Sequence, residues 1–392
     1  MSKKDTEIVE AGRRKSWTLG SVNPPVFHTS TVIFDSVAEM AEAGRKSHEI
    51  MSYGRRGTPT SFALCDALTT LSGAAGTVLY PSGLAAITTA MLTFAKAGTK
   101  VFIADNIYEP TRYFADHVLA KFGVEVVYYD PLIGAGIANL LDDRVSVVVM
   151  ESPGSITMEV QDVPAIAAAA HAVNATVILD NTWATPLYFD ALSHGVDVSV
   201  QALTKYVVGH SDAMLGSATA NARTIDTLRR QSGAIGQCAG PDDVYLGLRG
   251  LRTLPVRLAQ HQQSALTIAK WLQDRDEVAE VRHPALPSAP SYELWRRDFT
   301  GASGVFSFVL KEDNEAAITA FVEGMRHFKL GFSWGGFESL VMFYRHLSRI
   351  RTATPWSAGP VIRLQIGLED VDDLIADLAD AFKRYDAIIE HH

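Results

Sequence analysis

Cysteine and basic charge are both scarce in this chain of 392 residues. The two cysteines, Cys65 and Cys238, stand far apart and lack the C-x-x-C spacing of metal or redox sites, so a reducing, cytoplasmic setting is expected. Against 44 acidic residues there are 35 lysines and arginines, which gives a formal net charge of −9. Because no stretch of the chain concentrates the basic residues, nucleic acid is not an expected partner.

Long apolar runs and two common motifs are also missing. No run reaches the ~20 apolar residues that a membrane-spanning helix needs. The N-terminal segment MSKKDTEIVEAGRRKSW is charged throughout and has no apolar core of the kind that signal peptides contain. We therefore expect a soluble protein with no membrane partner. The P-loop and H-E-x-x-H motifs do not occur, and no metal is expected.

Two short motifs imitate known sites without meeting their requirements. The run GAGIAN (134–139) follows a predicted strand but lacks the third glycine of a dinucleotide fingerprint. His210, Ser211 and Asp212 carry the side chains of a hydrolase triad, yet adjacent residues cannot converge as a triad does. Neither a Rossmann dehydrogenase nor a serine hydrolase is therefore indicated.

From about Thr77 onward, short β-rich runs alternate with longer helical runs such as 84–98 and 163–173. This alternation predicts an α/β fold, in which helices cover both faces of a mostly parallel sheet of about seven strands. The runs predicted as strands are TVLY (77–80), KVFIAD (100–105), VEVVYYD (124–130), SVVVME (146–151), ATVILDN (175–181), VDVSVQAL (196–203) and MLGSATA (214–220).

Changes in composition and periodicity along the chain predict three parts. Residues 1–60 contain prolines, glycines and serines without strong periodicity, and we expect an extended arm that packs on something else. Residues 61–250 carry the alternating pattern of the main domain. Residues 251–392 predict a smaller α/β domain. Its expected elements are helices over 252–274 and 315–325 and a strand over 304–310.

In a parallel sheet, ligands bind outside the carboxyl ends of the strands. Segment 82–84 begins a helix after the first predicted strand, where free N–H groups can hold a phosphate, although Ser-Gly is also an ordinary helix cap. Tyr108 follows the second strand. Asp180 lies near the end of the fifth, where a buried acid needs a cationic partner or a ligand. Lys205 follows the sixth between the apolar runs VSVQAL and YVV, which indicates a desolvated amine.

Together these four groups fit the needs of pyridoxal phosphate. The lysine forms an imine with the aldehyde, the acid keeps the pyridine nitrogen protonated, the helix start holds the phosphate, and the aromatic side chain stacks on the ring. Each residue taken alone has an ordinary structural interpretation, such as a surface lysine or a loop tyrosine. The combination is what indicates the cofactor.

The segment DNTWATPLYFDALSHGVDVSVQALTKYVVGHSD (180–212) resembles the signature of the Cys/Met-metabolism family of pyridoxal-phosphate enzymes, which includes cystathionine β-lyases, γ-lyases and γ-synthases. The resemblance extends over residues 18–385. It implies the fold-type I, aspartate aminotransferase-like architecture, with 61–250 as the cofactor-binding domain. It also implies a cytoplasmic homotetramer built from two dimers, and Lys205 as the lysine that carries the cofactor.

The resemblance assigns further cofactor contacts position by position. Gly83 and Leu84 in YPSGLAA would donate backbone N–H groups to the phosphate, and Thr204 would contact it as well. Tyr108 in NIYEPT would stack on the ring. One position departs from the family pattern: many relatives have serine two residues before the threonine of the Thr-Lys pair, where this chain has Ala202.

Two other segments are implied to complete the site. SYGRRGTPT is similar to the family's Tyr-x-Arg segment, in which Tyr53 and Arg55 would reach the phosphate of a neighbouring subunit. SWGGFESL and VIRLQIG resemble the substrate-carboxylate site. There Arg363 would bind the amino-acid carboxylate, Ser333 would add a hydrogen bond, and Trp334 would form an apolar wall.

The reaction implied is β-elimination of L-cystathionine to homocysteine, pyruvate and ammonia, within methionine biosynthesis, with Lys205 and Tyr108 as catalytic residues. Tyr108-Glu109-Pro110-Thr111 resembles the β-lyase loop, and Ser333-Trp334 resembles the β-lyase Ser-Trp, where γ-acting relatives tend to have Ser-Leu. Trp334 and Glu109 would restrict the distal amino acid. The alternatives are a γ-lyase acting on cystathionine or methionine, a cysteine desulfhydrase, and a non-enzymatic regulatory protein on the same fold.

Overall fold

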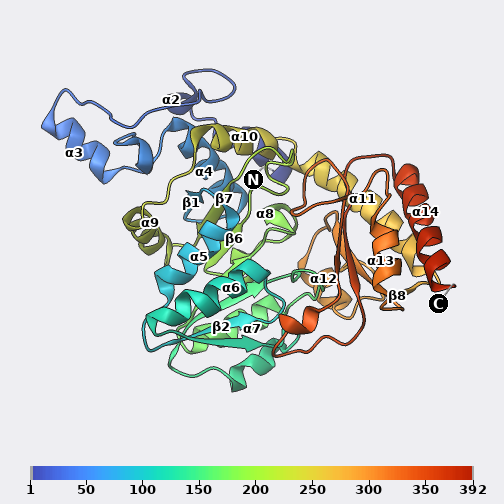
Figure 1. Ribbon diagram of the computed structural model, residues 1–392. Helices are drawn as coiled ribbons and strands as arrows, with labels where there is room; N and C mark the ends of the chain where they lie inside the picture. The colour runs from blue at the N-terminus through green and yellow to red at the C-terminus, as the bar shows by residue number, and fades with distance from the viewer. Residues whose placement is uncertain (1–2, 391–392) are drawn as a thin grey trace.

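The computed structural model describes residues 3–390 and contains two β-sheets with helices packed on them (Figure 1). The larger sheet has seven strands in the order β1-β7-β6-β5-β4-β2-β3. All seven runs predicted as strands form strands of this sheet. Their bounds are β1 Gly76–Tyr80, β2 Lys100–Ala104, β3 Glu125–Tyr129, β4 Val145–Glu151, β5 Thr176–Asp180, β6 Val198–Gln201 and β7 Gly216–Ala220.

The large sheet is mostly parallel, as predicted. Strands β3, β2, β4, β5 and β6 run parallel to their neighbours, whereas β7 is antiparallel to both β6 and β1. Parallel strands end at one edge of a sheet, so the residues after β2, β4, β5 and β6 meet there. In the register of β4 and β5, Glu151 lies opposite Asp180.

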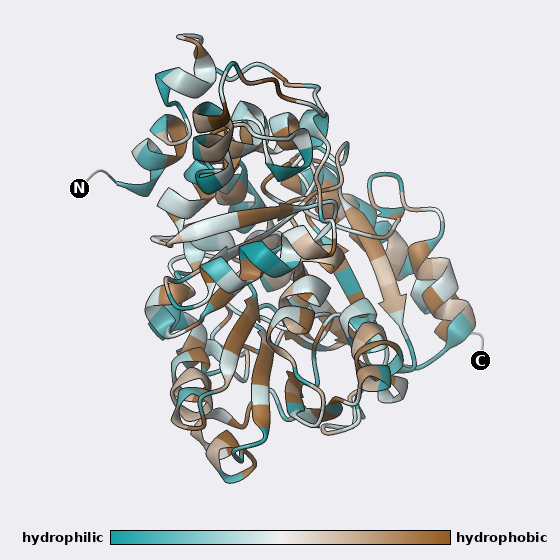
Figure 2. Ribbon diagram, turned by 90° about the vertical axis from the view of Figure 1, so that its left-hand side faces the viewer, coloured by the Kyte–Doolittle hydropathy of each residue, from teal (hydrophilic) through white to brown (hydrophobic). Residues whose placement is uncertain are grey.

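Helices cover the large sheet because its strands are rich in Val, Ile and Ala, whose side chains need cover on both faces. Two separate hydrophobic clusters form, one around Ile87 and Met91 and one around Val163 and Ile166. Figure 2 shows brown, apolar strands inside the molecule and teal residues on the outer faces of the helices. Helices in this part are α4 Pro59–Leu71, α5 Gly83–Phe94, α6 Glu109–His117, α7 Val163–Ala172, α8 Thr185–Tyr188, α9 Ile225–Ala234 and α10 Pro241–Leu251, with 3-10 turns η2 Leu119–Phe122, η3 Gly134–Asn139 and η4 Leu192–His194.

The second sheet has five strands in the order β10-β11-β12-β9-β8 and lies in the C-terminal part of the chain (Figure 1). Its core joins strand residues such as Phe308 and Leu364 to helix residues such as Leu272, Phe321 and Phe382. The elements are α11 Leu254–Gln273, β8 Val278–Arg282, α12 Tyr292–Asp298, β9 Val305–Leu310, α13 Glu315–Val322, β10 Lys329–Leu330, β11 Leu340–Tyr344, η5 Leu347–Arg349, β12 Val361–Gln365 and α14 Val371–Ile389.

The N-terminal segment begins beside the body of the molecule and projects from it farther along, around α2 Lys15–Thr18 and α3 Val37–Arg45 (Figure 1, blue). It is not wholly extended, because short helices form there and at α1 Lys4–Glu10, with a 3-10 turn, η1, at Gly54–Arg56. Helices α1 and α2 pack on α4, where Ile8 and Trp17 are buried. Further along, Ile33 is 89% exposed and Val37 is 78% exposed. The arm therefore packs on its own chain at α1 and α2, while side chains of its middle part such as Ile33 and Val37 stay exposed.

No helix between residues 3 and 390 combines the length and apolarity that crossing a membrane requires. Over the same residues, no three or more His, Cys, Asp or Glu side chains gather as a metal-binding group.

Candidate active site

The start of α5 lies at the carboxyl edge of the large sheet and presents free backbone donors there. The Ser82 hydroxyl caps the helix and accepts the Ala85 N–H at 3.0 Å. Within the described chain, the N–H groups of Gly83 and Leu84 meet no acceptor. A Cβ on Gly83 would lie 2.7 Å from the Ala202 Cα, so glycine is required where α5 meets the chain after β6. The free N–H groups and the positive end of the helix dipole form a phosphate-sized donor set.

Lys205 lies in the turn that follows β6, and its amine points to the second sheet. The Nζ donates to Ser333 Oγ at 2.5 Å and lies 5.3 Å from the ring centroid of Trp334. Burial, assisted by the Arg363 charge and opposed by Asp180, lowers the pKa of Lys205 to about 8. An amine with a pKa near neutrality is partly uncharged and can act as a nucleophile or a base.

Asp180 ends β5 and is held by a residue that the sequence analysis did not single out. The Thr182 backbone N–H and hydroxyl both donate to Asp180 Oδ1, at 3.0 and 2.5 Å. The same hydroxyl accepts the Ala202 N–H at 2.9 Å. Burial raises the pKa of Asp180, while Thr182 and the Lys205 charge oppose the shift. The spacing Asp-x-Thr at a strand end is the local signal that could have revealed this support.

Tyr108 follows β2 and precedes α6, and its position depends on a second carboxyl group. Its backbone N–H donates to Glu151 Oε2 at 2.7 Å. Burial raises the pKa of the Tyr108 phenol, and Glu151 adds to that effect. Sequence reasoning missed Glu151, because its only signal was a polar residue at the end of a predicted strand.

The second sheet supplies the groups expected for substrate. Arg363 on β12 donates to the Ser333 carbonyl at 3.3 Å, and its guanidinium lies 5.9 Å from the Tyr344 ring centroid. Ser333 has a left-handed backbone with φ of 77°, which is rare for serine and is found mostly where surrounding contacts impose it. The next glycine, Gly335, has φ of 87°, and a Cβ there would lie 2.9 Å from the Lys205 carbonyl carbon. The segment thus passes directly against the lysine.

Thr204 precedes Lys205, and its hydroxyl donates to the Leu215 carbonyl at 3.1 Å and accepts the Leu215 N–H at 2.9 Å. Two other predicted cofactor contacts, Tyr53 and Arg55, are not brought to this point within one chain. Tyr53 and Arg55 line a groove of about 1090 Å³ with α4, β1 and α9, and neither Lys205 nor Tyr108 is part of that lining. Arg55 donates to the Gly233 carbonyl at 3.0 Å.

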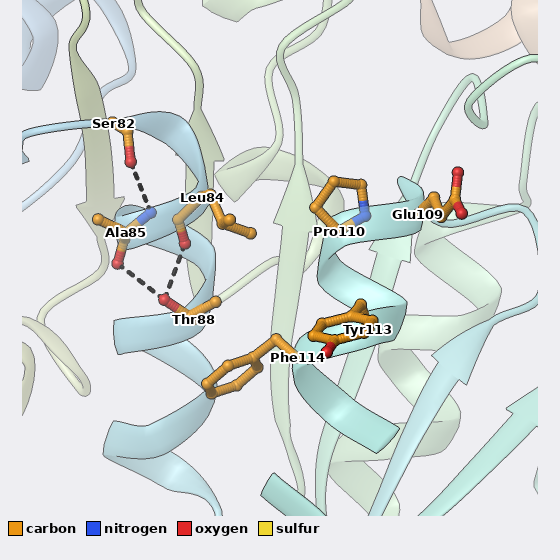
Figure 3. A pocket seen from close by; sticks show the side chains of 8 residues that line it. All are labelled: Ser82, Leu84, Ala85, Thr88, Glu109, Pro110, Tyr113 and Phe114. Atoms are coloured by element: carbon orange, nitrogen blue, oxygen red, sulfur yellow. Dashed lines mark hydrogen bonds between the residues drawn. The ribbon is translucent and has the colours of Figure 1, made fainter. Parts of the chain in front are cut away.

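A pocket of about 680 Å³ adjoins the phosphate-sized donor set, between the first turns of α5 and α6 (Figure 3). Its lining is Ser82, Leu84, Ala85, Thr88, Glu109, Pro110, Tyr113 and Phe114. Glu109 is the charged residue in this lining and stands at the first position of α6, where the helix dipole favours a carboxylate.

The chemistry of the donor set fits pyridoxal phosphate. Free N–H groups at Gly83 and Leu84 suit the phosphate, the partly uncharged amine of Lys205 suits the aldehyde, and the carboxyl of Asp180 suits the ring nitrogen. A fold with these groups outside the carboxyl ends of a mostly parallel sheet defines a fold-type I pyridoxal-phosphate enzyme.

The family model described as "Cys/Met metabolism PLP-dependent enzyme" matches residues 5–383, and the chain belongs to that family. It is therefore a pyridoxal-phosphate-dependent enzyme. Among similar proteins, a putative cystathionine beta-lyase of Rhizobium johnstonii is 52% identical over 94% of this chain and 93% of its own. Cystathionine beta-lyase MetC of Escherichia coli is 48% identical over 97% of this chain and 98% of its own.

Solved structures agree with the fold. A cystathionine gamma synthase from Xanthomonas oryzae pv. oryzae, in complex with aminoacrylate and cysteine, has a TM-score of 0.89 and is 30% identical. The alignment covers 99% of each chain. The predicted α/β, fold-type I architecture and the cofactor are thus confirmed.

Proposed function

We propose that this enzyme is a carbon–sulfur lyase that cleaves L-cystathionine by β-elimination to homocysteine, pyruvate and ammonia, within methionine biosynthesis. Curated cystathionine β-lyases at 45 to 52% identity over nearly the whole chain support this reaction. The observation in the molecule that carries the proposal is the hydrogen bond from Lys205 to Ser333, which places a partly uncharged amine beside the guanidinium-bearing strand β12.

Lys205, Tyr108, Asp180, Gly83, Leu84 and Thr204 would hold pyridoxal phosphate, with Lys205 as the point of covalent attachment. When bound, the cofactor supplies an electron sink that acidifies the Cα–H of an attached amino acid. The free carboxyl of Asp180, oriented by Thr182, would keep the ring nitrogen protonated. Tyr108 would cover one face of the ring. Because the pKa of its phenol is raised, it stays a hydrogen-bond donor near neutral pH.

The substrate would be oriented by the second sheet. Arg363 would bind the α-carboxylate through two N–H groups, with Ser333 and Trp334 beside it. Ser333 holds the Lys205 Nζ by a hydrogen bond, and this amine would remove the Cα proton of the bound substrate. With its pKa lowered to about 8, the amine would accept that proton and pass it to the sulfur as the Cβ–S bond breaks. The leaving thiolate would thus become the thiol of homocysteine, without the second proton removal from Cβ that a γ-elimination needs.

The complete site would require two subunits. Tyr53 and Arg55 lie on a segment with little cover in its own chain, in a groove apart from Lys205. In the proposed homotetramer, a dimer of dimers in the cytoplasm, they would contact the phosphate bound by a neighbouring chain. We also propose the division into an arm over 1–60, a cofactor domain over 61–250 and a C-terminal domain over 251–392.

A panel of L-cystathionine, L-methionine and L-cysteine with identification of products tests the function. We expect homocysteine and pyruvate from cystathionine, with slower turnover of cysteine and little of methionine. Cysteine and 2-oxobutyrate from cystathionine would replace the β-lyase with a γ-lyase. If no substrate is turned over by enzyme carrying the cofactor, the regulatory alternative is favoured.

A further inference from the structure

Glu151 is a carboxyl group at the edge of the site for which the proposed mechanism has no step. It ends β4, and in the parallel register with β5 it lies opposite Asp180. Its Oε2 accepts the backbone N–H of Tyr108 at 2.7 Å. One side chain thus links the residue proposed for the ring nitrogen to the residue proposed for the ring face.

Among the side chains that the structure describes, Glu151 has hydrogen-bond donors around it, and no Lys, Arg or His forms a salt bridge with its carboxyl group. The groups that face it are the Asp180 carboxyl from β5, the Tyr108 phenol and N–H from the segment before α6, and the Ser155 hydroxyl from the segment after β4. The nearby cations act on other members of the site: Lys205 on Asp180, and Arg363 on Tyr108.

Two neighbouring carboxyl groups cannot both be ionised at little cost. Burial raises the pKa of Glu151 well above its ordinary value, and the Asp180 charge raises it further, against the Tyr108 N–H and the Ser155 hydroxyl. Asp180 has the two Thr182 donors and the Lys205 charge on its side. The donors and the cation at Asp180 thus favour the anion on Asp180 and the proton on Glu151.

We propose that Glu151 is a positioning residue that, as an uncharged acid, fixes Tyr108 against the ring face and leaves Asp180 as the anion at the ring nitrogen. The inference rests on the roles proposed above for Tyr108 and Asp180. Tyr108 needs an acceptor for its backbone N–H, and the Asp180 carboxylate needs a neighbour without charge. Glu151 at the end of β4 would supply both.

Glu159 offers a matched comparison in the same segment. Glu159 is buried where Glu151 is half-buried, and it is paired: Arg351 Nη2 lies 3.2 Å and Arg282 Nη2 3.6 Å from its Oε1. These charges hold its pKa below the ordinary value. The change from carboxyl to amide should therefore have opposite consequences at the two positions, because an amide resembles an uncharged acid and cannot replace a paired carboxylate.

The test uses the holoenzyme with Glu151→Gln, Glu151→Ala and Glu159→Gln. We expect Glu151→Gln to keep kcat within about threefold of wild type, because the amide oxygen still accepts the Tyr108 N–H. Glu151→Ala should lower kcat about tenfold or more, because the N–H loses its acceptor. The pH titration of the visible cofactor absorption should keep its midpoint in Glu151→Gln and shift in Glu151→Ala.

Thermal unfolding of the cofactor-free proteins gives an independent readout. A glutamate with a raised folded pKa keeps a proton that the unfolded chain releases, so stability falls as pH rises above the ordinary glutamate range. Glu151→Gln should remove that part of the slope, while Glu159→Gln should lower the unfolding temperature and leave the absorption midpoint unchanged. The inference is overturned if Glu151→Gln shifts the midpoint, or if Glu151→Ala matches wild type in kcat and midpoint. Failure of the proposed reaction would instead appear in the identity of the products, which these variants do not alter.

Discussion

Replacing Lys205 by methionine should make the cofactor-free protein more stable at neutral pH while abolishing turnover. The pKa of Lys205 is lowered from 10.5 to about 8, chiefly by burial. The folded protein therefore binds its proton less tightly than the unfolded chain does. At 1.36 kcal/mol for each pKa unit, keeping this amine charged costs the folded state about 3 kcal/mol at pH 7.

The pH dependence follows from the same shift. For a group whose folded pKa is lowered below its unfolded value, stability rises with pH between the two values. Lys205→Met should therefore show its full advantage below about pH 8 and lose it as pH approaches 10.5. The lost hydrogen bond to Ser333 reduces the gain by about 1 kcal/mol.

Calorimetric unfolding of both cofactor-free proteins at pH 7 and pH 10 measures the difference. Lys100→Met serves as the control, because Lys100 is paired with Asp142 at 2.6 Å and its loss should give no gain at either pH. If Lys205→Met is no more stable than wild type at pH 7, or if its advantage does not shrink at pH 10, the amine is not a desolvated charge and the reasoning is refuted.

Two further predictions concern the carboxylate beside the ring nitrogen and the sharing of active sites between subunits. Asp180→Asn should lower kcat by about a hundredfold or more, while the amide oxygen still accepts from Thr182 and the fold is kept; near-normal turnover would refute the role of Asp180. Mixed and re-associated Arg55→Ala and Lys205→Ala chains should recover about a quarter of wild-type activity, since half of the dimers are hybrids with one intact site of two. A fully active monomer in sedimentation would contradict the shared site.

Much of the large sheet was predictable because local sequence decides it. Runs such as SVVVME and ATVILDN combine β-branched residues with boundaries set by polar residues, and both form strands. Lys205 and Asp180 were found by a topological rule, since the carboxyl ends of parallel strands share one edge. The short helices of the arm were not predicted, because α1 and α2 are stabilised by packing on α4 rather than by their own periodicity.

Long-range contacts explain what sequence could not reveal. Asp105 ends the β2 run as Asp180 ends β5, yet it anchors a loop: it accepts the backbone N–H groups of Thr352, Ala353 and Thr354 at 2.7 to 3.0 Å. No residue near Asp105 in the sequence indicates that these partners lie more than 240 positions away. The same holds for Glu151, whose partner Tyr108 is brought to it only by the order of the strands.

The attachment of the cofactor to Lys205 is the claim on which the account depends most. Borohydride reduction of the holoenzyme, followed by proteolysis and mass spectrometry, identifies the lysine that carries the pyridoxyl group. The account predicts a single modified peptide that contains Lys205, and no modified peptide in the Lys205→Ala protein. A pyridoxyl group on any other lysine of the native enzyme would contradict it.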